Sequence, residues 1–242
     1  MRHLAERHLS AIDINDPTEL DDEQKLILGL AVGYAVVVMV LWKLPFLHWL
    51  LFPFKVMTVG LHEFGHAIVC TLTGGKVEEI QLDLKQGGVT ITRGGSQRLM
   101  LPAGYLGSSL CGALMIMSAF DNLASKIASV VFGVIMLLVL YWASNYVARI
   151  IGFVFMALVV ALWFIKDGDG IRYVVLFLGV MSALYSIWDI IEDLILRKVN
   201  GSDATKMAEV CGCCPARGWG IIWCFISIFF LIAGVVAGLL FF

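Results

Sequence analysis

Apolar residues in this sequence are grouped into long runs that short polar segments separate. Each run approaches the ~20 residues that an α-helix needs to cross the hydrocarbon core of a bilayer. The pattern predicts an all-α polytopic membrane protein with about seven transmembrane helices, in one integral membrane domain over residues 26–242. The predicted spans are residues 26–44, 53–73, 99–120, 127–145, 147–165, 171–196 and 218–242.

Residues 76–92, which follow the second run, show a different pattern. Apolar and polar residues alternate in "KVEEIQLDL" and in "VTITRGG", and the stretch "KQGG" lies between them. Alternation with a period of two on both sides of a glycine-rich turn is typical of a β-hairpin. We therefore expect a small hairpin directly after the second helix; an ordinary amphipathic loop is the alternative.

The composition supports a membrane location. Of the 242 residues, 60% are apolar and 15% are charged, and the mean hydropathy is +0.90. A soluble domain carries about a quarter charged residues, so the excess of apolar surface requires lipid around it. The net charge of −2 and the lack of a basic run give no indication of a nucleic-acid partner.

The distribution of lysine and arginine predicts how the chain is oriented. Residues 1–25 are polar and acidic, and they lack the positively charged start and short apolar core of a cleaved signal peptide. With seven spans, most of the 17 Lys and Arg residues fall on the same side as the N-terminus. By the positive-inside rule, the N-terminal segment and the hairpin are then cytosolic, and the C-terminus lies on the other side.

Three residues in the second run, within "VGLHEFGHAIVC", indicate chemistry. His62 and His66 are four residues apart, so on a helix they lie on one face about one turn apart. Two imidazoles at this spacing can hold a Zn²⁺ ion, and Glu63 beside them can take a proton from zinc-activated water. Ionisable residues inside a span are costly, which favours a functional site. A polar helix–helix contact without metal is the alternative.

A catalytic zinc site takes three protein ligands, so a carboxylate from another span is expected as the third. The sixth run, "LYSIWDIIEDLILRK", offers Asp189, Glu192 and Asp193. Asp189 and His66 each lie eight residues before the cytosolic end of their span, about 12 Å from that surface at 1.5 Å per residue. We therefore predict Asp189 as the third ligand, with Asp193, one turn nearer the surface, as the alternative.

Several segments resemble the M50B-like membrane peptidase family, which is of the site-2 protease type of intramembrane zinc metalloprotease. They are "GLHEFGHAIVCTLTGGKVEEIQLD", "PAGYLGSSL", "SIWDIIEDLI" and "GSDATKMAE", and the similarity covers about residues 53–225. The resemblance implies zinc held by His62, His66 and an aspartate, with Glu63 as catalytic base, in a metalloprotease core at about 53–197. It also implies substrates that are membrane-spanning or membrane-anchored segments. Asp203 in "GSDA" falls in a predicted cytosolic loop, where we expect it to cap a helix.

The predicted function is hydrolysis of peptide bonds in membrane proteins by zinc-activated water, with an extended substrate paired to an edge of the hairpin. An inactive relative that binds membrane protein clients is the first alternative, although such a protein has no use for a base at Glu63. A transporter is the second alternative, and it would spread ionisable residues over several spans and show an internal repeat. The sequence shows no such repeat, and its intramembrane polar residues are concentrated in the second and sixth runs.

Overall fold

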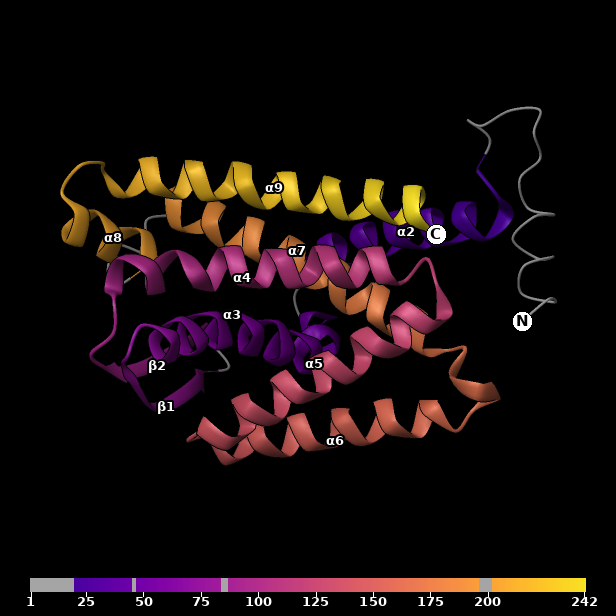
Figure 1. Ribbon diagram of the computed structural model, residues 1–242. Helices are drawn as coiled ribbons and strands as arrows, with labels where there is room; N and C mark the ends of the chain where they lie inside the picture. Colours follow the sequence, from indigo (N-terminus) through magenta and orange to yellow (C-terminus); the bar gives the residue numbers. More distant parts are fainter. Residues whose placement is uncertain (1–19, 45–46, 84–86, 196–201) are drawn as a thin grey trace.

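The computed structural model describes residues 20–44, 47–83, 87–195 and 202–242, which form helices and one β-hairpin (Figure 1). The long helices are α2 (Asp22–Lys43), α3 (Phe52–Leu72), α4 (Gln97–Ser118), α5 (Asn122–Trp142), α6 (Tyr146–Trp163), α7 (Ile171–Ile195) and α9 (Ala216–Phe241). The short helices are η1 (Leu47–Leu51), η2 (Lys166–Gly168) and α8 (Asp203–Cys211), and the strands are β1 (Lys76–Asp83) and β2 (Gly87–Arg93). Each predicted span corresponds to a long helix, so the predicted helical fold with a small hairpin is confirmed.

Helix α3 differs from the other long helices in composition and position. Among the described residues, six helices are long and apolar enough to cross a membrane, namely α2, α4, α5, α6, α7 and α9. Helix α3 is not among them, and Lys55 and the H-E-x-x-H residues interrupt its apolar run. It packs against α4, α5, α6 and α7, so protein rather than lipid surrounds much of it. This position makes polar residues tolerable at the depth of a membrane span.

Helix α4 is the central helix of the bundle and contacts α3, α7 and α9. Small residues make these contacts close. A Cβ on Gly65 of α3 would overlap the backbone of α4, and a Cβ on Gly112 of α4 would lie 2.9 Å from backbone atoms of α7. Gly234 of α9 faces the backbone of Ala113 in the same way. Such contacts let membrane helices approach closely, and here they bring side chains of α3, α4 and α7 together.

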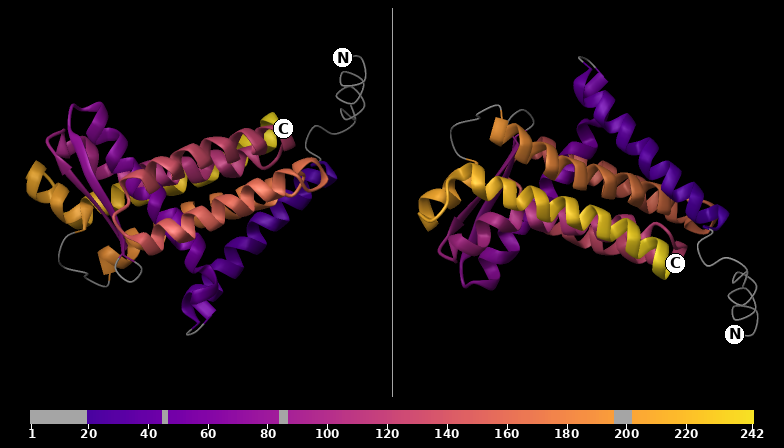
Figure 2. Two further views of the ribbon diagram at one scale, coloured as in Figure 1. Left: turned by 90° about the horizontal axis from the view of Figure 1, so that it is seen from below. Right: turned by 90° about the horizontal axis from the view of Figure 1, so that it is seen from above.

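Helices α2 and α3 point in the same direction, although they are consecutive. The end of α2 lies beside the later part of α7, where the rings of Trp42 and Tyr185 stack with centroids 5.8 Å apart. The start of α3 lies nearer the beginning of α7, where the rings of Phe54 and Phe177 are 4.7 Å apart. The chain therefore turns back at η1, at the side of the bundle, and α3 runs towards the hairpin again (Figure 2).

The start of α2 consequently lies at the end of the bundle opposite the hairpin (Figures 1 and 2). Gln24 donates a hydrogen bond to the carbonyl of Leu239 at 3.2 Å, and Glu23 pairs with Arg172 at 3.2 Å. The sequence predicted that the N-terminal segment and the hairpin share a side, and the structure differs for the described part of that segment. The reason is that a count of apolar runs assumes that every run reverses the chain. Residues 1–19 lie outside the described residues.

Strands β1 and β2 pair antiparallel, with Ile80 opposite Thr90 and Leu82 opposite Gly88. The other edge of β1 contacts the connection between α5 and α6. Ser144 donates its N–H to the carbonyl of Ile80 at 3.0 Å, and a second hydrogen bond of 3.4 Å reaches the carbonyl of Leu82. Because these two carbonyls point away from β2, the backbone groups of Thr90 and Gly88 point away from β1. The outer edge of β2 therefore carries backbone groups that β1 does not pair.

Candidate metal centre

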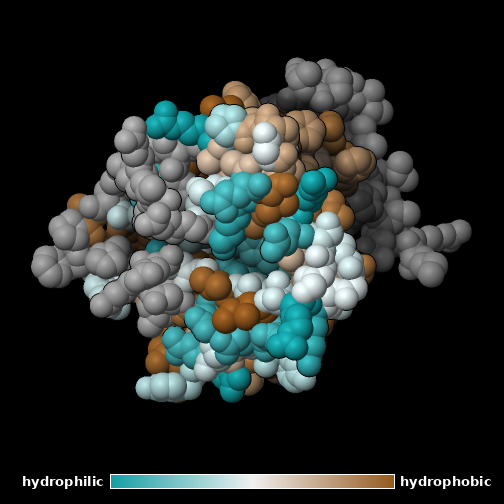
Figure 3. All heavy atoms as spheres, turned by 90° about the vertical axis from the view of Figure 1, so that its left-hand side faces the viewer, coloured by the Kyte–Doolittle hydropathy of each residue, from teal (hydrophilic) through white to brown (hydrophobic). Residues whose placement is uncertain are grey.

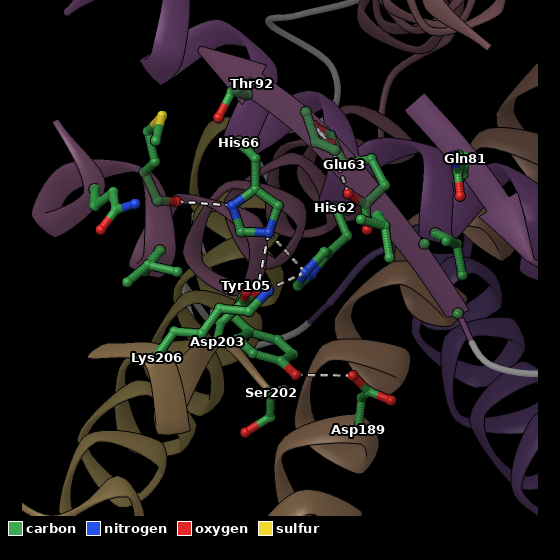
Figure 4. Close-up of a pocket in the computed structure, with 18 of the residues that line it drawn as sticks. His62, Glu63, His66, Gln81, Thr92, Tyr105, Asp189, Ser202, Asp203 and Lys206 are labelled. Atoms are coloured by element: carbon green, nitrogen blue, oxygen red, sulfur yellow. Dashed lines mark hydrogen bonds and ion pairs between the residues drawn. The ribbon is translucent and has the colours of Figure 1, made fainter. Parts of the chain in front are cut away.

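Helix α3 stacks its two motif histidines on one face. The Nε2 atoms of His62 and His66 are 3.1 Å apart (Figure 4). The Nδ1 atom of His66 lies 2.8 Å from the backbone carbonyl oxygen of Met100. Because a carbonyl only accepts hydrogen bonds, this contact places the ring proton on Nδ1. The Nε2 lone pair of a neutral His66 then faces His62, which is the arrangement that metal binding requires.

The carboxylate of Asp203 completes the group. Its Oδ2 atom lies 3.1 Å from the Nε2 atoms of both His62 and His66. Ser202 is the N-cap of α8, since its hydroxyl accepts a hydrogen bond from the N–H of Thr205. The capping role expected for Asp203 thus belongs to Ser202, and Asp203 is the first residue of the helix proper.

The electrostatics of the group keep Asp203 charged. Burial alone would raise the pKa of this carboxyl. The positive charge that His66 carries when both its ring nitrogens are protonated, and the hydrogen bonds that both histidines then donate, outweigh burial and hold the pKa of Asp203 well below its ordinary value. A metal ligand must be deprotonated, so Asp203 is in the form that coordinates a cation.

Apolar packing fixes the short helix that carries Asp203. Ala204 and Met207, three residues apart on one face of α8, are buried. They belong to a cluster with Leu101, Tyr105, Ile190 and Trp223, which come from α4, α7 and α9. The position of Asp203 therefore depends on how α8 docks onto three membrane helices.

The three facing atoms fit a tetrahedral metal ion. The two Nε2 atoms and Oδ2 of Asp203 form a triangle with sides of 3.1 Å. Two ligands of a tetrahedral zinc ion, each bound at about 2.0 Å, are about 3.3 Å apart. Gly104 of α4 keeps the neighbouring space open, because a Cβ there would lie 2.6 Å from Nε2 of His62 and would overlap His66. Two imidazoles and one carboxylate are a donor set of catalytic zinc sites, so these residues fit Zn²⁺.

The structure does not bring Asp189, the predicted third ligand, to the histidines. Its Oδ2 atom instead accepts a hydrogen bond from the hydroxyl of Tyr105 at 2.9 Å. The ring of Tyr105 packs edge to face on His62, with centroids 4.6 Å apart. Asp189 lies at about the depth of the histidines, as predicted from its position along the span. Its side chain contacts Tyr105 there instead of the histidines. The side chain of Asp193, the alternative candidate, lies outside the described part of the structure.

The sequence-based prediction of a third ligand considers only carboxylates inside the membrane spans, and Asp203 lies outside them. Two signals in the sequence could have found it. The serine in "GSDA" is a preferred N-cap residue and marks a helix start. The apolar residues Ala204, Met207 and Cys211 then recur at helical spacing, which predicts a short helix that docks through one face. A short helix outside the spans, such as α8, can therefore place a carboxylate beside the histidines once it docks onto the membrane helices.

Glu63 lies beside the triangle and against strand β2. The ligand atoms of His62, Glu63 and His66 all lie within 4.8 Å of one another. Oε2 of Glu63 accepts a hydrogen bond from the hydroxyl of Thr90 at 2.6 Å. A cavity of about 600 Å³ adjoins these groups and is lined by residues of α3, β2, α4, α7 and α8. Hydrophilic residues gather in the middle of the face at this end of the molecule (Figure 3), so the buried group adjoins a polar surface.

Long apolar helices around a buried group of two histidines and two carboxylates define a multi-pass integral membrane protein with a candidate metal centre. The Peptidase M50B-like family profile matches residues 30–234. Because this range is most of the chain, the protein belongs to the Peptidase M50B-like family, as its motifs predicted. No curated protein and no solved structure matches the chain.

Proposed function

We propose that this protein is a zinc metallopeptidase that cleaves membrane-spanning or membrane-anchored segments of other proteins. The observation that carries the proposal is the convergence of His62, His66 and Asp203 on one point, with Glu63 beside them. Membership of a peptidase family and six helices of membrane length support this activity at the bilayer.

His62, His66 and Asp203 are the proposed zinc ligands, so Asp203 takes the role that the sequence assigned to Asp189. A zinc ion held there supplies Lewis acidity, which polarises a peptide carbonyl and makes water a stronger acid. The Met100 carbonyl orients the ring of His66 from behind, as an outer partner of a metal site does, and Tyr105 restricts the ring of His62 by packing.

Glu63 is the proposed general base and acid. Its side chain is buried, with 3% of its surface exposed, and it lines the polar cavity. Thr90 engages Oε2, which leaves Oε1 to accept a proton from the attacking water. The same atom then delivers the proton to the amine of the leaving segment.

Strand β2 is the proposed binding edge for an extended substrate. A peptide bond within a helix is shielded, so the substrate must unwind before its carbonyl can be attacked. The backbone groups of Gly88 and Thr90 point away from β1, and both residues line the cavity. A segment that pairs there lies next to Glu63, because the same two residues contact the base. The outer edge of β1 is less suitable, since Ser144 already bonds to it.

Zinc content and cleavage test the proposal together. The purified protein is reconstituted in liposomes with a set of single-span fusion proteins that carry a different tag on each side of the span. The wild type should contain one zinc per chain and separate the tags. Glu63→Gln should keep the zinc and slow cleavage by about 100- to 10,000-fold, because proton transfer is lost.

Glu209→Gln is the matched control, since Glu209 also lines the cavity but is exposed and does not contact the metal group. It should cleave like the wild type. A wild type without zinc, or a Glu63→Gln variant that cleaves at the wild-type rate, would contradict the proposal. Binding of the fusion proteins without zinc or cleavage would identify a client-binding relative instead.

A further inference from the structure

We propose that Thr90, a residue of strand β2, positions the carboxylate of Glu63 for proton transfer. The proposal rests on the proposed function, in which Glu63 is the base. Thr90 and Glu63 are 27 positions apart in the sequence, and Thr90 lies outside the H-E-x-x-H motif. Only the docking of the hairpin on α3 brings the two side chains together.

The contact between the two side chains is short and charge-assisted. The hydroxyl oxygen of Thr90 lies 2.6 Å from Oε2 of Glu63 and 3.2 Å from the backbone carbonyl oxygen of the same residue. A hydroxyl has one proton to donate, and the closer, charged acceptor takes it. Oε2 is therefore held in one place, and Oε1 is the atom left to handle the proton.

Gly88 confines the carboxylate from the other side. A Cβ at this position would overlap Oε1 and the carbon atoms of the Glu63 side chain. Gly88 is not among the glycines with positive φ, so a side chain here would displace the Glu63 carboxylate rather than strain the backbone. The carboxylate thus lies between a hydroxyl that binds one oxygen and a bare backbone that limits movement of the other.

The strand that carries Thr90 is itself held in place. Its partner β1 is bonded to the α5–α6 connection through Ser144. Strand β2 also packs directly on α3, and Thr92, two residues along β2 and on the same face as Thr90, lies next to Cys70 of α3. A side chain presented by a fixed element can hold a reacting group more accurately than one on a loose loop.

A simpler role for Thr90 is to fasten the hairpin to α3, and Thr92 distinguishes the two roles. Both threonines project from the same face of β2 towards α3, but Thr92 lies next to Cys70 and only Thr90 bonds to Glu63. Thr90→Val removes the hydroxyl and keeps the shape of the side chain, and Thr92→Val makes the same change without touching the base. Thr90→Ser restores the hydroxyl.

The test measures kcat and KM for a cleaved single-span fusion protein, together with zinc content. Thr90→Val should lower kcat by about 10- to 100-fold, as expected for loss of a hydrogen bond to a charged group, and leave KM and zinc content unchanged. Thr90→Ser and Thr92→Val should stay within about threefold of the wild type. An infrared difference spectrum of wild type against Glu63→Gln identifies the carboxylate band of Glu63, and Thr90→Val alone should shift it.

Three results would overturn the positioning role: a Thr90→Val variant with wild-type kcat, a Thr92→Val variant that is equally slow, or a Thr90→Ser variant that is not restored. A wild type without Glu63-dependent cleavage would overturn the proposed function and this inference with it. A wild type that cleaves, beside a Thr90→Val variant that cleaves equally fast, would overturn the inference alone.

Discussion

The two ends of the helix bundle both bury charged groups, but the end opposite the hairpin uses its charge for structure. Arg172 is 6% exposed, and its guanidinium donates hydrogen bonds to the carbonyls of Ala119 and Phe120. These carbonyls follow the end of α4, where a helix leaves backbone acceptors without partners. Glu23 of α2 pairs with the same guanidinium. The buried charge of Arg172 thus serves backbone acceptors that the fold needs to satisfy.

The hairpin end arranges its buried charges differently. His62, His66 and Asp203 point at one another from two helices, and a polar cavity lies beside them. Among the described residues, Nδ1 of His62 has no hydrogen-bond partner. Burial of a charge is therefore not in itself a sign of function in this protein. Convergence of several ligand atoms on one point, next to a cavity, is the feature that separates the two ends.

The proposed difference between the two ends of the bundle depends most strongly on Asp203 acting as a metal ligand. Asp203→Ala should weaken zinc binding by about 100-fold or more, because a direct ligand matters at least as much as its outer partners. Asp189→Ala should keep one zinc per chain, since Asp189 bonds to Tyr105 and not to the histidines. Metal analysis and zinc titration of the purified variants provide the measurement. The reverse result would make Asp189 the ligand after all.

A substitution at Gly104 tests the space beside the proposed metal ligands without changing any of them. Gly104→Ala should weaken zinc binding by about 10- to 100-fold, because the new methyl group occupies space at both ligand nitrogens. Gly107→Ala is the matched control one turn further along α4, where the nearest atom to the new Cβ is 3.5 Å away. Zinc titration of both variants should show a loss only for Gly104→Ala. Equal affinities would mean that the bare Cα of Gly104 is not needed beside the metal.

Arg172 gives the smallest expected effect, and it should concern stability alone. Arg172→Met leaves two helix-end carbonyls without a donor, which should lower the free energy of unfolding by about 1–3 kcal/mol. Glu23→Gln should cost less than about 1 kcal/mol, because the Glu23 side chain is 75% exposed. Denaturant unfolding in detergent micelles measures both. Loss of zinc from Arg172→Met, with unchanged stability, would contradict the division between the two ends.

The sequence by itself determined the features that depend on near neighbours along the chain. Apolar runs predicted each long helix, because burial of such a run in lipid needs no knowledge of its partners. Alternation around a glycine-rich turn predicted the hairpin, now seen as β1 and β2. The four-residue spacing of His62 and His66 placed them on one face, and their Nε2 atoms are indeed 3.1 Å apart.

The tertiary structure alone decided the direction of α2 relative to α3, the carboxylate beside the histidines and the partner of the base. The two residues of the His62–Asp203 pair are 141 positions apart, and their contact exists because α8 docks through Ala204 and Met207. Depth along the membrane normal is one coordinate that a sequence can supply. Two residues at equal depth can still be separated across the bundle, as Asp189 is by Tyr105. The lateral position comes from the close packing of whole helices, which no local pattern encodes.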